Sequence, residues 1–421
     1  MKNFIKNIFL GNDIPIQYHS NFIHLYFEIG WFGVLSGSTV NFISVYATRI
    51  GATGLQLGLM GAMSAIVSLL LAIPAGHWLE KNARGRAVFW LSVIYRTGFL
   101  LYIPLPWLLN SQNQILTLIG LSFLMGIPLI GLSVGFSALF AESVPDQWRA
   151  HAAGLRNVIL STLFMVTSLI SGFILNHLVF PLNYQIVFLI GFFGAAMSSY
   201  HLYFIKPINN NFQMETIASK FLSTSNENKK TQGWQKAIRA DIWETKYKWT
   251  MLVMLFFHIT QYLALPLFPL FFVRHLNLSD QNLGIGTAMF YLTVLIGSTQ
   301  LNYLVHKFGH KRVTGWGVVG MALYPGLMAI SSLVWHIYAI SIIGGLAWAF
   351  VGGASANYII ENCPTNDRPA YLAWYNVILN ASILIGSVLG PTLADSLGLT
   401  NALILFAIGR GMAGFAILKW G

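Results

Sequence analysis

The residues from Ile115 to Phe140 read ILTLIGLSFLMGIPLIGLSVGFSALF and contain no charged side chain. A second apolar run extends from Trp335 to Ile359. A helix needs about 20 apolar residues to cross a membrane, because the hydrocarbon layer is about 30 Å thick and each residue rises about 1.5 Å. Strands of a membrane barrel instead alternate in polarity over about ten residues. The two runs therefore predict membrane-spanning helices.

The whole chain has the same character. Of its 421 residues, 56% are hydrophobic and 9% are charged, whereas soluble domains carry about 25% charged residues. The lone cysteine, Cys363, excludes an intrachain disulfide and a cysteine-cluster metal site. The apolar stretch before Gly11 is too short for the core of a signal peptide, so we expect no cleavage.

The hydropathy pattern predicts an all-α membrane protein with twelve transmembrane helices. The spans lie at about 22–46, 55–79, 88–109, 114–140, 155–178, 184–205, 249–273, 283–305, 313–334, 337–360, 372–394 and 401–420. One long hydrophilic segment lies at the midpoint. We therefore expect a six-helix bundle over 1–205, a linker over 206–248 and a second six-helix bundle over 249–421. In the linker, Trp234, Ile238 and Ile242 have helical spacing, which predicts an amphipathic helix on the inner membrane surface or packed on the protein.

The basic residues predict the orientation. Most of the 24 Lys and Arg residues, Arg156 among them, fall on the side that holds both termini and the linker, and only Arg49 and Arg274 fall in loops on the other side. Because basic loops stay in the cytoplasm, we expect an inner-membrane protein with both termini inside. The net charge of +11 then reflects topology and contact with anionic lipid, and not a nucleic-acid patch.

The chain contains an internal repeat. Residues 142–157 read ESVPDQWRAHAAGLRN and residues 361–376 read ENCPTNDRPAYLAWYN, so that Glu, Pro, Arg and Asn recur at the same offsets. A second match has a different offset: Lys81, Arg86 and Trp90 recur as Lys307, Arg312 and Trp316. Two matches at equivalent places indicate two related halves.

The loop from Gly76 to Arg86 reads GHWLEKNARGR. It resembles the signature loop between the second and third helices of the major facilitator superfamily, with Glu80 for the commoner Asp and Ala83 at an expected Gly. The second copy, 302–312, keeps Gly309, Lys311 and Arg312 but has Asn302 for Gly and His306 for the acid. The resemblance implies two bundles around a central cavity that opens to alternate sides.

The resemblance also implies a cytoplasmic gate, in which ion pairs hold the helix ends together in one state and release them in the other. The alternative is that these charges only fix the topology. The candidate gate residues are Gly76, Glu80, Arg84, Arg86, Glu142, Arg149, Lys311, Arg312, Glu361 and Arg368.

Three ionisable residues fall within predicted spans: Glu28, Arg96 and Arg410. A charge at membrane depth costs a few kcal/mol, so each is a candidate functional residue. Glu28 is the candidate proton-coupling carboxylate, with His24, one turn away, or Arg96 as its partner. The alternative is a static Glu28–Arg96 pair that ties two helices together.

Polar and aromatic residues near mid-depth are candidates for the substrate cavity: Asn41, His258, Gln261, Tyr262, Trp348, Asn357 and Asn380. Aromatic walls with a few polar groups are typical of binding pockets. Each residue can also be an interhelical hydrogen-bonding contact. Residues 386–391, GSVLGP, resemble part of a glycine–proline motif of drug–proton antiporters, but that motif belongs to the fifth span and this match lies in the eleventh.

These patterns favour a secondary active transporter of a small, neutral or amphipathic organic solute, with proton-coupled export preferred over uptake or facilitated diffusion. A non-transporting pigment- or lipid-binding scaffold on the same fold is the other class. We expect no enzyme activity, because no nucleophile, metal-ligand or phosphate-loop constellation is visible. We expect a small-molecule substrate and membrane lipids as partners, no nucleic acid, no cofactor or metal, and a monomer.

Overall fold

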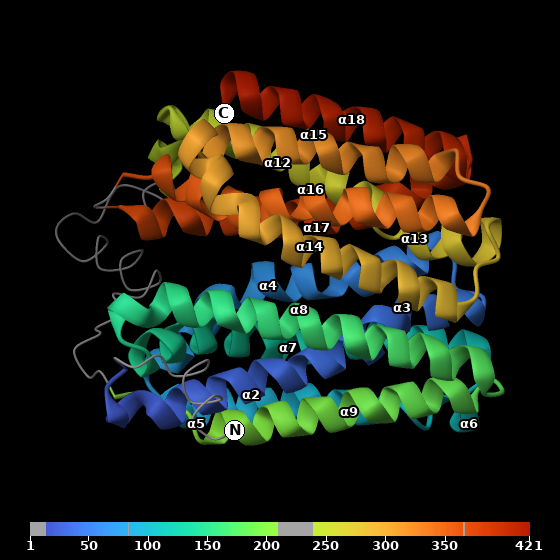
Figure 1. Ribbon diagram of the computed structural model, residues 1–421, viewed down its shortest axis with the longest axis horizontal. Helices are drawn as coiled ribbons and strands as arrows, with labels where there is room; N and C mark the ends of the chain where they lie inside the picture. The colour runs from blue at the N-terminus through green and yellow to red at the C-terminus, as the bar shows by residue number, and fades with distance from the viewer. Residues whose placement is uncertain (1–13, 83, 209–238, 365–366) are drawn as a thin grey trace, which may run out of the picture. The chain divides into compact units, whose positions relative to one another are not determined.

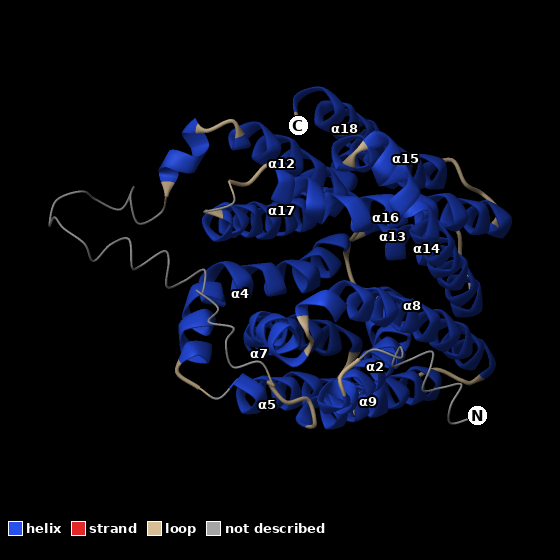
Figure 2. Ribbon diagram, turned by 60° about the vertical axis from the view of Figure 1, so that its left-hand side comes forward, coloured by secondary structure: helices blue, strands red, loops and turns tan. Residues whose placement is uncertain are grey.

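The computed structural model describes residues 14–82, 84–208, 239–364 and 367–421. Nothing is described of the side chains of Glu80 and Pro369. Within the described residues the chain forms helices joined by short loops, with no strand (Figure 2). The all-α class is confirmed. The described helices form two compact units, one within residues 14–43 and 71–208 and the other within residues 44–70 and 239–421.

The first unit contains the helices of the N-terminal half. They are η1 (Ile16–Tyr18), α2 (His19–Leu35), the π-helical turn η2 (Ser36–Val40), the end of α4 (Gly54–Glu80), α5 (Arg84–Thr97), η3 (Gly98–Tyr102), α6 (Leu105–Leu108), α7 (Ser111–Ser143), α8 (Asp146–His177) and α9 (Leu182–Tyr203). Helix α2 packs against α8 and α9, and α5 packs against α7 and α9. The predicted first, third, fourth, fifth and sixth spans thus share one core.

The second unit contains the remaining helices. They are most of α3 (Asn41–Arg49), the start of α4, η4 (Ala240–Glu244), α12 (Tyr247–Ala264), α13 (Leu267–Leu270), the π-helical turn η5 (Phe271–His275), α14 (Asp280–Phe308), α15 (His310–Ala329), α16 (Val334–Glu361), α17 (Arg368–Leu397) and α18 (Leu399–Trp420). Helix α12 packs against α17 and α18, while α15 packs against α16 and α18 (Figure 1).

The internal repeat is visible in this packing. In the first unit the first span packs on the fifth and sixth, and the third packs on the fourth and sixth. In the second unit the seventh span packs on the eleventh and twelfth, and the ninth packs on the tenth and twelfth. The same pairs therefore recur six helices apart, as related halves require.

Nine helices of the described residues are long and apolar enough to cross a membrane. The other three predicted spans, 22–46, 88–109 and 313–334, also form helices, but each falls short for a local reason. The first runs through α2, the π-helical turn η2 and α3 and carries Glu28, the third is a short α5 that carries Arg96 and continues as η3, and the ninth begins with His310, Lys311 and Arg312. The count of twelve spans stays a prediction.

Residues 44–70 pack with the C-terminal helices in the second unit, where two glycines allow the contact. A Cβ on Gly58 would lie 1.9 Å from the carbonyl oxygen of Ser387, and a Cβ on Gly54 would lie 3.0 Å from Cβ of Pro391. Any larger residue at position 58 would therefore push α4 away from α17.

Charged contacts reinforce this packing at the ends of the helices. The guanidinium of Arg49 lies 2.9 Å from a carboxylate oxygen of Asp280 and donates to the carbonyl of Leu278 at 2.6 Å. In return, Arg274 donates to the carbonyl of Ala52 at 2.6 Å. The two arginines that the sequence places in the loops of the non-cytoplasmic side thus both join residues 44–70 to the helices after α12.

The described end of the linker packs on the protein. Ile242 of η4 is fully buried, and the ring of Trp243 meets Trp374 at 5.5 Å. Arg239 pairs with Asp367 at 2.5 Å and with Asp241 at 3.0 Å, and its hydrogen bond lowers the pKa of Asp241 below the usual value. Trp234 and Ile238, the other members of the predicted amphipathic stripe, lie outside the described residues.

Arg410 is a fully buried cation that bonds to carbonyl groups. It donates to the carbonyls of Met321 at 3.2 Å, Thr260 at 3.1 Å and Gln261 at 3.2 Å. Pro325 lies four residues after Met321 within α15 and has no N–H, so the carbonyl of Met321 lacks its helical donor. Helix α12 ends at Ala264, which leaves the carbonyl of Gln261 among the last four. Arg410 supplies the missing donors.

We expect Arg410→Met to destabilise the protein by about 1–3 kcal/mol, because a buried carbonyl is left without a donor. Pro325→Ala restores an N–H opposite Met321, so the double variant should lose less than Arg410→Met alone. Thermal unfolding of the purified protein in detergent measures both. Losses that simply add would contradict this role of Arg410.

Candidate transport site and gates

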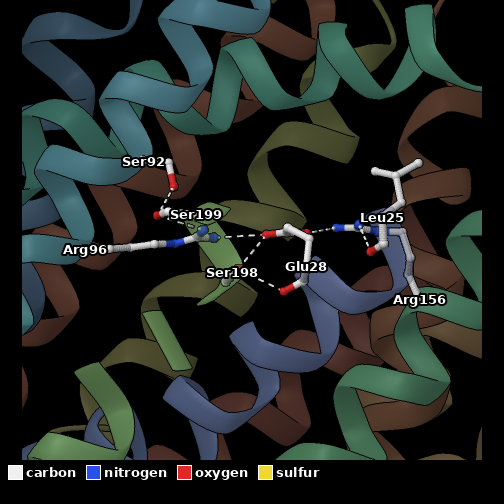
Figure 3. Close-up of polar contacts among 7 residues, drawn as sticks. All are labelled: Leu25, Glu28, Ser92, Arg96, Arg156, Ser198 and Ser199. Atoms are coloured by element: carbon white, nitrogen blue, oxygen red, sulfur yellow. Dashed lines mark hydrogen bonds and ion pairs between the residues drawn. The ribbon is translucent and has the colours of Figure 1, made fainter. Parts of the chain in front are cut away.

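Glu28 lies between two arginines in the first unit (Figure 3). One carboxylate oxygen accepts from Arg96 at 3.0 Å, and the other accepts from Arg156 at 3.0 Å. The hydroxyl of Ser198 donates to the Arg96-bound oxygen at 3.0 Å and to the Glu28 carbonyl at 2.8 Å. Arg96 also donates to the Ser199 hydroxyl at 3.3 Å. Both carboxylate oxygens of Glu28 therefore accept hydrogen bonds.

The network joins four helices. Glu28 belongs to α2, Arg96 to α5, Arg156 to α8, and Ser198 and Ser199 to α9. Glu28 and Arg96 are each 4% exposed and Arg156 is 8% exposed, so all three charges are buried. Two guanidiniums face one carboxylate, which leaves an excess positive charge inside the unit. The guanidinium of Arg156 lies over the ring of Phe136 at 4.8 Å, and this cation–π contact stabilises its charge.

Arg156, counted from the sequence with the charges outside the spans, is buried within α8. The fifth span was expected to begin at 155, but α8 begins at Asp146, which places Arg156 almost three turns inside the helix. There it also donates to the carbonyl of Leu25 at 2.7 Å.

His24 contacts another histidine and not Glu28. Its Nδ1 lies 3.0 Å from Nδ1 of His201 on α9, so that one ring donates a hydrogen bond to the other, and its ring stacks on Phe204 at 4.8 Å. The structure brings Arg96 to Glu28 but turns His24 toward the end of α9. The serines of α9 carried no sequence signal, because short hydroxyl side chains are common in membrane helices.

In the second unit, Tyr375 takes the repeat position of Arg156 and contacts His258. Nε2 of His258 on α12 lies 2.9 Å from the hydroxyl of Tyr375 on α17. The offset that relates residues 142–157 to 361–376 places Tyr375 at the position of Arg156. The repeat therefore contained a signal for Arg156 and Tyr375, neither of which was predicted as a site residue.

The other cavity candidates are distributed over both units. The Tyr262 ring lies 6.5 Å from that of His258, and Oε1 of Gln261 is buried without a donor among the described residues. Asn380 donates to the carbonyl of Asn376 at 2.8 Å. In the first unit the Asn41 amide donates to the Ser168 hydroxyl at 3.0 Å, and in the second unit Trp348 and Asn357 are exposed on α16.

Two ion pairs occupy equivalent places at the predicted gate. In the first unit Arg84, at the start of α5, pairs with Glu142 near the end of α7. In the second unit Nε2 of His310, at the start of α15, lies 3.6 Å from Glu361 at the end of α16. The two offsets of the repeat superimpose Arg84 on His310 and Glu142 on Glu361. The second pair is charged on both sides only when the imidazole is protonated.

The remaining gate candidates behave differently. Arg149 pairs with Asp146 at 2.8 Å and donates to the carbonyl of Ala141. Gly76 is buried within α4, and the side chain of Glu80 lies outside the description. Four cations are solvent-accessible with no carboxylate partner among the described residues: Arg86, Lys311, Arg312 and Arg368.

The comparison with known families agrees with this architecture. The family profile of the Major Facilitator Superfamily matches residues 29–246 and 250–420. The chain belongs to the Major Facilitator Superfamily. The resemblance noted in the signature loop is thereby confirmed. This chain of the Major Facilitator Superfamily (MFS) is a membrane transporter and not an enzyme.

Relatives of this MFS chain include resistance proteins. A tetracycline resistance protein, class H, of Pasteurella multocida is 29% identical over 27% of this chain and 28% of its own length. The chain thus matches under a third of that relative. An uncharacterized MFS-type transporter of Methanocaldococcus jannaschii is 20% identical over 85% of this chain and 87% of its own length.

Solved structures share the fold. The crystal structure of the nucleoside transporter NupG has a TM-score of 0.63 and 12% identity, and the match covers 96% of this chain and 99% of that one. At this identity the likeness shows the fold alone.

We expect Glu28→Gln to destabilise the protein by about 3–5 kcal/mol, because it leaves two buried guanidiniums without a counter-charge. Arg96→Met should cost less, since the Glu28–Arg156 pair remains balanced. Thermal unfolding in detergent compares the two variants. A larger loss for Arg96→Met would contradict the charge balance proposed for this network.

Proposed function

We propose that this MFS chain exports a small, neutral or amphipathic organic solute across the inner membrane in exchange for protons. The observation that carries the proposal is the polar and aromatic cluster of His258, Tyr262 and Tyr375, which offers hydrogen bonds and ring faces without a carboxylate. Such a surface suits an uncharged or amphipathic molecule. The resistance function named for the Pasteurella multocida relative supports export.

Gln261 adds specificity to this cluster. A buried amide oxygen without a donor costs about 1–3 kcal/mol, which a substrate hydroxyl or N–H can recover. Gly386 allows this arrangement, because a Cβ there would lie 2.8 Å from Cβ of Tyr262. The glycine of the eleventh span thus sets how closely α17 approaches the wall that carries the cluster.

Glu28 is the proposed proton-coupling carboxylate. Protonation of its carboxylate would remove the negative charge that holds Arg96 and Arg156. Because these residues come from α5 and α8, proton binding would loosen both helices from α2. Because the network carries an excess positive charge, protonation of Glu28 is unfavourable until one arginine side chain moves away from it. Proton binding is in this way coupled to a conformational change.

The ion pairs Arg84–Glu142 and Arg49–Asp280 are the proposed gates of the two sides. Each pair lies within one compact unit and joins helix ends from different spans. Exposed ion pairs contribute at most about 1 kcal/mol, but Glu142 and Asp280 are buried, which strengthens the attraction. Each pair can therefore stabilise one conformational state of the transporter and still break during transport.

The function is tested in two steps. Thermal unfolding of the purified protein is measured against tetracycline and a panel of sugars, amino acids, nucleosides and drugs, because a ligand that binds the folded state raises the midpoint. Transport of a hit is then measured in proteoliposomes with and without a proton gradient. Tyr375→Phe should weaken binding of the hit, whereas Tyr303→Phe, on α14, should not. The absence of any hit would favour a non-transporting scaffold.

We expect transport to lose its pH dependence in Glu28→Gln, since this side chain cannot accept a proton at the carboxylate. Glu28→Asp keeps the charge and is the matched control, which should retain a pH-dependent rate. An unchanged pH profile in Glu28→Gln would refute proton coupling at this residue and leave it a structural ion pair.

We expect Arg84→Glu to reduce transport strongly without reducing the amount of protein in the membrane, because two carboxylates then face each other. Adding Glu142→Arg restores an ion pair of opposite polarity and should recover part of the rate. No recovery in the double variant, with the protein still folded, would mean that Arg84 and Glu142 act separately.

A further inference from the structure

A groove of about 380 Å³ lies between α14, α15 and α16 in the second unit. Its walls are almost entirely apolar and include Phe308, Val313, Ile343 and Phe350. Gly317 and Gly320 hollow the face of α15 on its floor. None of the predicted cavity residues lines this groove, so it is separate from the proposed substrate cluster.

The groove runs from one end of the helices toward mid-depth. Along α15 it extends from Arg312 to Gly320, eight residues, which corresponds to about 12 Å at helical rise. One leaflet of the hydrocarbon layer is about 15 Å thick, half of the roughly 30 Å layer. The groove therefore has the depth of an acyl chain that enters from the membrane surface at Arg312.

The mouth of the groove is positively charged. Arg312 lines it and is exposed, and Lys311 precedes it. Nζ of Lys307 lies 5.3 Å from the ring of Phe308, itself a wall of the groove. Neither these two lysines nor Arg312 has a carboxylate partner among the described residues. Glu361, the acid at the end of α16, instead lies against His310.

Trp316 completes the mouth. It lines the groove one turn deeper than Arg312 and is 59% exposed. Tryptophan is enriched at the boundary between headgroups and hydrocarbon, because its ring is apolar and its N–H is polar. The order along α15 is thus cation, indole and apolar floor, which matches the order of headgroup, glycerol backbone and acyl chain in a phospholipid.

We propose that this groove binds one anionic phospholipid of the leaflet on the Arg312 side, with its phosphate at Arg312 and Lys311 and one acyl chain between α14, α15 and α16. By the expected orientation this is the cytoplasmic leaflet. The second copy of the signature loop, which lacks the acid of the first at His306, thus becomes a lipid-binding element and leaves its cations free for a phosphate.

The test uses the full chain purified in detergent and stripped of lipid. Native mass spectrometry measures the affinity of the first bound dioleoylphosphatidylglycerol and, separately, dioleoylphosphatidylcholine. The anionic lipid should bind about fivefold more tightly for each basic contact that it makes near the surface. Equal affinities for the two lipids would overturn the proposal.

Matched variants locate the site. Arg312→Gln should weaken phosphatidylglycerol binding about fivefold. Lys419→Gln, which removes a positive charge from the last turn of α18, should not weaken it. Ile343→Trp fills the groove and should weaken both lipids, whereas Ile342→Trp lies next to it on the exposed face and should weaken neither. Equal effects of Arg312→Gln and Lys419→Gln would show nonspecific attraction and overturn the assignment.

A headgroup probe separates lipid from free anion. Glycerol 3-phosphate carries the charge without the acyl chains, so it should fail to displace phosphatidylglycerol even in large excess. Full displacement would mean that the basic mouth binds a soluble phosphate and that the groove is not an acyl site.

Discussion

The burial of charge governs this structure. Inside a membrane protein an ion needs its counter-charge or its hydrogen bonds within reach, because water is absent and the dielectric is low. Glu28 meets this need for Arg96 and Arg156 and thereby ties α2, α5, α8 and α9 to one point. In the second unit Arg410 has only carbonyl groups, and it ties α18 to α12 and α15. Each bundle is thus held by one buried cationic centre.

The two halves share a packing plan and differ in their chemistry. The position of Arg156 in the first unit is Tyr375 in the second, and the position of Arg84 is His310. Both changes replace a permanently charged guanidinium, by a phenol at Tyr375 and by an imidazole at His310. The first half therefore carries fixed ion pairs, whereas the second half carries uncharged or titratable contacts, at the same places in the fold. This asymmetry suits a division between coupling in one unit and solute binding in the other.

The glycines of the GSVLGP stretch in the eleventh span allow close helix packing. A Cβ on Gly390 would lie 2.1 Å from the carbonyl oxygen of Leu263, and a Cβ on Gly386 would lie 2.8 Å from Cβ of Tyr262. These glycines allow α17 to pack closely on α12, and Gly58 allows α4 to pack closely on Ser387 of α17. The backbone of α17 is therefore in close contact on two faces, so that small shifts in it reach both neighbours.

Hydropathy and the two offsets of the repeat predicted the helical membrane fold and its related halves, and the signature loop from Gly76 to Arg86 indicated the family, because each is a local or periodic property of the chain. The charges within the predicted spans pointed to Glu28 with Arg96, and the repeat and the signature loop named Arg84 and Glu142 as gate residues without pairing them. Only the tertiary structure decided that Arg156 is buried beside Glu28, that His24 meets His201, and that residues 44–70 pack with the C-terminal helices. Partners such as Glu28 and Arg156 come from helices far apart in sequence. Which side chains meet depends on helix rotation and on close approach at glycines, which no periodicity records.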